Sequence, residues 1–198
     1  MEAFDEKKLE GLLRKLAAWK RIAFMAQVAA RMLPNYERFS AETGFGDVAV
    51  LKRALDAAWF WVQSGKPPHD LTALREACEK QAPDTEHFRS PYTSAALDAA
   101  NATAAILDAI EHPAEARLTE VASLARDTVD LFVQELMNMD PNAPNFEEAI
   151  SRHNLMQREL QRQREDLETL TKWLGERSIA SRELRTRSDG TSGSLQDS

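Results

Sequence analysis

Five polar residues have the types and spacing that could form a ligand-binding site. They lie around a proline inside one predicted helix and on a second, Ala-rich predicted helix: Arg31, Asn35, Tyr36, Asp98 and Asn101. Residues three or four apart share a helix face, and a proline within a helix leaves a carbonyl one turn earlier without its donor. The bend at Pro34 could therefore open a small polar cleft. A buried Arg31–Asp98 ion pair is the structural alternative, because a buried charge needs a partner.

The sequence has one short-range cluster of residue types that bind metals, namely Asp84, Glu86 and His87. Zinc requires three or four converging ligands, and helical di-iron sites use a Glu-x-x-His from each of two helices. Neither pattern is present, so we expect no metal here. The sequence also lacks a Gly-rich phosphate loop and a nucleophile elbow. We therefore predict no cofactor, and no catalytic residue is identified.

Residues 91–111 predict the helix that positions the second pair of candidates. Ala is the best helix former, and larger apolar residues return every three or four positions. We expect burial along one stripe, whose small side chains let neighbouring helices approach closely: Ala95, Ala99, Thr103 and Ile106. The complementary stripe is either a solvated face or a polar seam facing a pocket or a partner: Ser94, Asp98, Asn101, Ala105 and Asp108.

Helical periodicity extends over most of the remaining chain. It predicts further helices over residues 5–43, 48–62, 71–78, 118–139 and 146–175. The first is one long helix or two abutting ones, and it either kinks at Pro34 or ends and restarts there. Gly44 and Asp47 predict a helix stop followed by a capped restart.

The fold class is therefore predicted to be all-α. Residues 1–177 should form a single-domain bundle of six to seven helices around the Ala-rich central helix. Residues 178–198 contain few apolar side chains, too few to offset the entropy of ordering. This segment is expected to be a disordered polar tail.

Charge and hydropathy limit the class of partner. The net charge is −7, and the acidic excess lies in residues 1–175, because the last 23 residues carry four arginines and four acids. Nucleic-acid binding needs clustered Lys and Arg, so it is disfavoured. No apolar run reaches the roughly 18 residues that cross a bilayer, so no membrane span is expected. The absence of a secretory signal and the single cysteine, Cys78, favour the cytoplasm.

Several short motifs resemble the YjaG family of bacterial proteins. They include Trp19, Phe24-Met25-Ala26, Arg31-Met32, Pro34-Asn35-Tyr36, Phe39, Thr43-Gly44-Phe45-Gly46-Asp47, Pro83, Tyr92 and Asp98-Ala99. The resemblance covers nearly the whole length apart from the tail, and it implies a small, cytoplasmic, all-helical bacterial protein. The family is catalogued as a domain of unknown function without an established activity or ligand. The resemblance therefore adds to the fold prediction only.

Two hypotheses about function follow from the sequence. The favoured one is a non-enzymatic helical interaction module, because catalytic motifs are absent. Such a module could form a homodimer. The alternative is an enzyme or small-ligand binder whose polar pocket lies between the Pro34 bend and the central helix. A cavity holding the five candidate residues favours the second hypothesis, whereas a packed interior with an exposed apolar patch favours the first.

Overall fold

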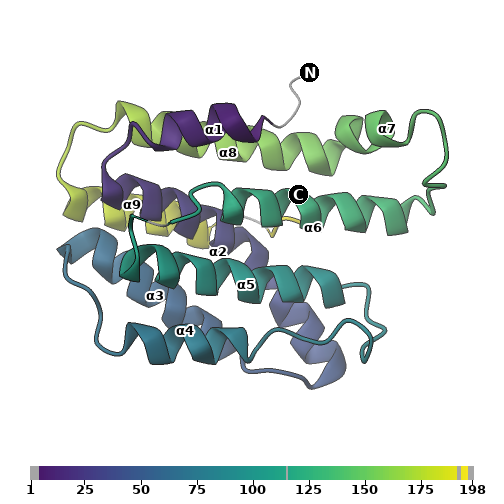
Figure 1. Cartoon of the computed structure of the whole chain (residues 1–198), viewed down its shortest axis with the longest axis horizontal. Helices are drawn as coiled ribbons and strands as arrows, with labels where there is room; N and C mark the ends of the chain where they lie inside the picture. The colour runs from purple at the N-terminus through teal and green to yellow at the C-terminus, as the bar shows by residue number, and fades with distance from the viewer. Residues whose placement is uncertain (1–4, 115, 191–192, 196–198) are drawn as a thin grey trace.

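A computed structural model describes residues 5–114, 116–190 and 193–195, which form nine α-helices and no strand. The helices are α1 (Glu6–Leu13), α2 (Ala18–Thr43), α3 (Val48–Ser64), α4 (Leu71–Glu79), α5 (Thr93–Glu111), α6 (Glu120–Leu136), α7 (Phe146–Arg152), α8 (Asn154–Lys172) and α9 (Arg177–Asp189). In Figure 1, α1, α7 and α8 lie along one edge and α4 along the opposite edge. The predicted all-α class is confirmed.

Two helix boundaries follow directly from local sequence. Gly44 ends α2 with φ = 71°, a left-handed conformation that suits glycine, and its N–H donates to Ser40 O. Asp47 then caps α3, because its side chain accepts from the N–H of Ala49. The predicted stop and restart are confirmed. Before Gly44, α2 continues through Pro34, so the helix does not end at the proline.

The core is shared by α2 and α5. The predicted buried stripe of α5, Ala95, Ala99, Thr103 and Ile106, is buried throughout. This helix packs against α2, α3, α4 and α6, while α2 packs against α3, α5, α6, α8 and α9. The Ala-rich helix α5 therefore shares the interior with α2, which also reaches α8 and α9.

The described residues form three more helices than the six predicted ranges, for three reasons, of which the first was one of the predicted alternatives. The first predicted helix is split into α1 and α2 by residues 14–17. The last one breaks at His153, whose backbone is extended (φ = −61°, ψ = 141°) and whose Nδ1 accepts from Leu155 N. The third reason is α9, which the sequence analysis assigned to the tail.

The prediction of a disordered tail is wrong for residues 178–190 and 193–195. Helix α9 packs against α2 and α3, and it buries Ala180 and Leu184. Much of its docking is polar: Arg177 donates to Val62 O at 2.7 Å, and Ser181 donates to Trp59 O at 3.2 Å. Small side chains and hydrogen bonds to carbonyls order this segment, and apolar content does not reveal them. Residues 191–192 and 196–198 lie outside the described residues.

No helix in the described part of the chain combines the length and hydropathy needed to span a bilayer.

Candidate functional site

The structure distributes the five predicted candidates over several environments. Arg31 faces α8, Asn35 contacts the C-terminal segment, and Tyr36 contacts the end of α4. Asp98 contacts α6, and Asn101 lines an open groove. Within the described residues, neither of the two cavities discussed below is lined by more than one of the five.

Arg31 lies in a buried ionic network between α2 and α8. Its guanidinium donates to Asp166 Oδ2 at 2.6 Å and to Glu159 Oε1 at 3.2 Å. Gln27, one turn earlier on α2, donates from Nε2 to the other oxygen of Asp166 at 2.5 Å. The alternative of an Arg31–Asp98 ion pair is therefore wrong, because two carboxylates of α8 are the partners of Arg31.

The charges of this network depend on one another. Burial alone would lower the pKa of Arg31, but Glu159 and Asp166 outweigh burial and raise it. Burial raises the pKa of Asp166, and the charge of Arg31 opposes that rise. Because a buried carboxylate without a cation is strongly disfavoured, Arg31 compensates the charges that α8 buries against α2.

Asn35 holds the C-terminal segment against the Pro34 bend. Its Nδ2 donates to Ser194 Oγ at 2.7 Å, and the N–H of Ser194 donates to Arg31 O at 2.8 Å. Arg158 of α8 donates to Ser194 O at 3.0 Å. The N–H that Pro34 lacks would have donated to Ala30 O, so the acceptor Arg31 O lies next to the carbonyl that the proline leaves without its helical donor. Ser194 thus lies where the sequence predicted a cleft.

Tyr36 forms a hydrogen bond between α2 and the segment that follows α4. Its hydroxyl donates to Gln81 O at 2.9 Å, and Gln81 Oε1 accepts from Asp47 N at 2.8 Å. Burial, with a smaller effect from the charge of Asp47, raises the pKa of Tyr36 to about 12. The phenol therefore stays protonated and donates. Gly46 lies directly against this hydroxyl, and its φ is 80°.

Asp98 is a half-buried carboxyl at the contact between α5 and α6. Thr128 Oγ1 donates to its Oδ2 at 2.8 Å. Burial raises the pKa of Asp98 to about 6, the hydrogen bond from Thr128 opposes this rise, and the charge of Asp127 adds to it. A perturbed carboxyl is one mark of a functional group, but Asp98 does not line the groove that starts one turn further along α5.

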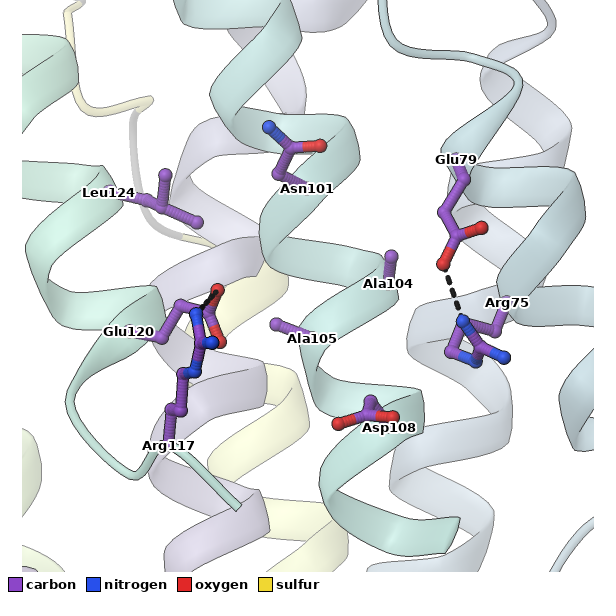
Figure 2. A pocket seen from close by; sticks show the side chains of 9 residues that line it. All are labelled: Arg75, Glu79, Asn101, Ala104, Ala105, Asp108, Arg117, Glu120 and Leu124. Atoms are coloured by element: carbon purple, nitrogen blue, oxygen red, sulfur yellow. Dashed lines mark hydrogen bonds and ion pairs between the residues drawn. The ribbon is translucent and has the colours of Figure 1, made fainter. Parts of the chain in front are cut away.

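That groove has a volume of about 440 Å³ and lies between α4 and α6, with α5 as its floor. Figure 2 shows Ala104 and Ala105 on the floor, with Asn101 and Asp108 at either end of this stretch of α5. Because the two alanines are short, the larger side chains of the flanking helices rise above them. Three members of the predicted polar stripe, Asn101, Ala105 and Asp108, therefore face a hollow.

Each wall of the groove carries an ion pair, as Figure 2 shows. On the α4 wall, Arg75 Nη1 lies 2.6 Å from Glu79 Oε1. On the α6 wall, Arg117 Nη1 lies 3.8 Å from Glu120 Oε1. Asp108 on the floor contacts His112 at 3.1 Å, and half of its side chain is exposed. An exposed carboxylate between two internally paired walls can accept a cationic hydrogen-bond donor.

The Asp84–Glu86–His87 cluster is an exposed turn. His87 Nδ1 lies 2.8 Å from Asp84 Oδ2, and Asp84 accepts from Glu86 N. The backbone donor from Glu86 and then the His87 side chain hold the pKa of Asp84 below its usual range. Across the residues that the structure describes, no three His, Cys, Asp or Glu side chains are grouped so that they could hold a metal ion.

The partners of Arg31 were not predicted from the sequence, although a signal for them exists. Glu159, Gln163 and Asp166 are spaced by four and three along α8, and all three are buried. They share a face with leucines of the packing side. Acid and amide side chains at helical spacing among buried leucines indicate a buried polar seam, but they do not identify which cation lies opposite.

Comparison with known proteins gives one family match and several relatives. The model of the family described as "Protein of unknown function (DUF416)" matches residues 8–194. The chain is 29% identical over 119 residues to "Uncharacterized protein YjaG" of Escherichia coli (strain K12) and 27% identical to the protein of that name in Salmonella typhimurium. Each alignment covers 57% of this chain and 61% of the relative, so the chain spans about three fifths of these relatives.

A solved structure has the same fold. The crystal structure of a DUF416 family protein from Shewanella baltica OS155 superposes with a TM-score of 0.83, covering 94% of each chain at 24% sequence identity. At this identity the likeness establishes the arrangement of the helices and nothing about a ligand.

Proposed function

This chain belongs to the DUF416 family, a family of unknown function, and we propose that it is a non-enzymatic interaction module that binds a basic segment of a partner protein. The observation that carries the proposal is the open groove between α4 and α6 with an exposed carboxylate on its floor. The role in binding predicted for Asn101 is part of this proposal, because that residue forms one end of the floor.

Charge supports a basic partner. The groove lining carries two cations, Arg75 and Arg117, and three acids, Glu79, Asp108 and Glu120, so its formal charge is +2 − 3 = −1. Both arginines are paired to acids of their own wall. The whole chain has a net charge of −7, which favours encounter with positively charged molecules. A Lys or Arg side chain is the chemistry that complements this floor.

The size of the groove suits a protein segment that inserts one or two side chains into it. A volume of about 440 Å³ falls in the range of roughly 300–1,000 Å³ that binding pockets occupy. The walls of the groove are charged, so it lacks the apolar lining that buries most of a small molecule. We therefore assign it to an extended or helical segment lying across α5.

The proposal includes two further statements that the sequence suggested. A cytoplasmic location is supported by the single cysteine, Cys78, which leaves the chain without an intramolecular disulfide. Self-association is supported by large apolar side chains exposed near the C-terminal end of α6, Leu131, Leu136 and Met137. Analytical ultracentrifugation of Leu136→Glu beside the unchanged protein tests the second statement, since a dimer through this end should dissociate.

The groove is tested with a labelled hexalysine peptide as a probe, by fluorescence anisotropy at low salt. Asp108→Asn should weaken binding several-fold, because it removes the floor charge that a lysine would contact. Asp84→Asn is the matched control: it also neutralises a half-exposed Asp with a His one turn away, but it lies outside the groove. Equal effects of the two substitutions would show that the peptide responds only to net charge, and the groove would not be the site.

A further inference from the structure

A second, smaller cavity lies between α2, α8 and α9, on the Arg31 network and separate from the groove. Its volume is about 110 Å³, and its lining includes Gln27 and Arg31 of α2, Arg162 and Asp166 of α8, and Arg187 of α9. One water needs on the order of 10–15 Å³, so this cavity can hold several heavy atoms. It is smaller than the roughly 300–1,000 Å³ of a site for drug-sized ligands.

One side of this cavity presents hydrogen-bond acceptors. Gln27 is only 1% exposed, and its Nε2 is engaged by Asp166. Its Oε1 is buried and accepts no hydrogen bond from any residue that the structure describes. Asp166 is 4% exposed, and its two oxygens accept from Gln27 Nε2 and Arg31 Nη1. A buried acceptor without a donor is costly, so this side favours a ligand with N–H or O–H groups.

The other side of the cavity presents guanidinium groups. Burial, followed by the like charges of Arg158 and Arg31, lowers the pKa of Arg162, and the charges of Glu159 and Asp166 oppose this fall. Arg187 Nη2 lies 3.5 Å from Glu165 Oε2, at the exposed rim of the cavity. The lining carries Arg31, Arg162 and Arg187 against Glu165 and Asp166, a formal charge of +3 − 2 = +1.

We infer that this cavity binds a small zwitterion of the amino-acid class, with its ammonium at Gln27 Oε1 and Asp166 and its carboxylate at Arg162. A zwitterion matches both sides of the lining at once. A plain anion would leave the Gln27 carbonyl unpaired, and a plain cation would lie beside three arginines. The role in ligand binding predicted for Arg31 takes this form: it holds Asp166 in place and borders the site.

The test is isothermal titration calorimetry of the full chain with glycine, L-alanine and L-serine, and with acetate and methylammonium at equal ionic strength. We expect saturable binding of at least one amino acid. Acetate and methylammonium should each bind at least ~10-fold more weakly, because each lacks one of two charge-assisted contacts. Arg162→Gln should weaken amino-acid binding by a similar factor. Arg164→Gln, an exposed change on the same helix outside the lining, should leave it unchanged.

Three results would overturn the inference. The first is the absence of saturable binding of all three amino acids to a protein whose circular dichroism shows native helix content. The second is acetate binding as tightly as the amino acids, which would make the cavity a simple anion site. The third is an equal effect of Arg162→Gln and Arg164→Gln. Arg162 is half-buried, so Arg162→Gln could also affect folding. Thermal melting of both variants distinguishes a folding defect from a loss of binding. None of these results bears on the groove at α5.

Discussion

Replacing Arg31 with Met tests whether the buried network holds α8 on α2. The substitution keeps a long side chain but leaves Glu159 and Asp166 buried without their cation. Removing one partner of a buried ion pair typically costs about 3–5 kcal/mol. Because a domain of this kind is stable by roughly 5–15 kcal/mol, the variant should lose a large part of its stability. The measurement is urea unfolding followed by tryptophan fluorescence.

A matched control lies on the same helix. Arg38 also pairs with an acid, Glu42 at 3.2 Å, but its side chain is 59% exposed. Exposed pairs of this spacing contribute about 0.3–0.5 kcal/mol, so Arg38→Met should change the free energy of unfolding little. Exchanging the whole trio for apolar residues, Arg31→Met with Glu159→Met and Asp166→Leu, should be less destabilising than Arg31→Met alone, because the two buried carboxylates are removed together with their cation.

The effect of Arg31→Met should also depend on pH. Burial already raises the pKa of Asp166, and Arg31 opposes that rise, so losing Arg31 raises it further in the folded state. An acid with a raised folded-state pKa binds more protons when folded, so stability falls as pH rises through that pKa. The difference from the unchanged protein should therefore be larger at pH 8 than at pH 5. A small, pH-independent effect of Arg31→Met would refute the reasoning.

Three further predictions concern the loop, the half-buried acid and the C-terminal helix. Gly46→Ala should lower the melting temperature, because φ is 80° and the added Cβ would lie 2.0 Å from the hydroxyl of Tyr36. Gly44→Ala, with φ = 71° and open space, should cost only the left-handed backbone penalty of about 1–2 kcal/mol, and equal losses would contradict the clash. The pKa of Asp98 is raised to about 6, above about 3.9 in the unfolded chain, so the stability that the protonated carboxyl contributes is lost as pH rises through 6. Asp98→Asn should therefore be more stable than the unchanged protein at pH 7.5 but not at pH 4, as measured by urea titration at both pH values. An equal gain in stability at both pH values would contradict the proposed titration of Asp98. A chain ending at residue 176 should melt well below the full chain, because it loses the buried contacts of α9 and the Arg177 hydrogen bonds to α3. An unchanged melting temperature would show that α9 does not stabilise the fold.

Local sequence determined the parts of this fold that depend on neighbouring residues. Helical periodicity indicated the all-α class, and the conformational freedom of Gly44 and the capping oxygen of Asp47 specified the turn between α2 and α3. The spacing of small residues predicted the buried face of α5. It also identified the stripe with Asn101 and Asp108 as a face distinct from the core. These features are encoded within one or two helical turns.

Only the tertiary structure decided which faces meet. The partners of Arg31 lie 128 and 135 residues further along the chain, and no local pattern distinguishes α8 from α5 as the helix opposite it. The same limit explains α9, whose Arg177 and Ser181 bind carbonyls of α3. The amino-acid composition of the segment indicates only how much apolar surface it could bury. The contacts of α9 are instead hydrogen bonds to backbone carbonyls, which are available only once α3 has formed. Long-range packing therefore set both cavities, because each is formed where side chains from three separate helices converge.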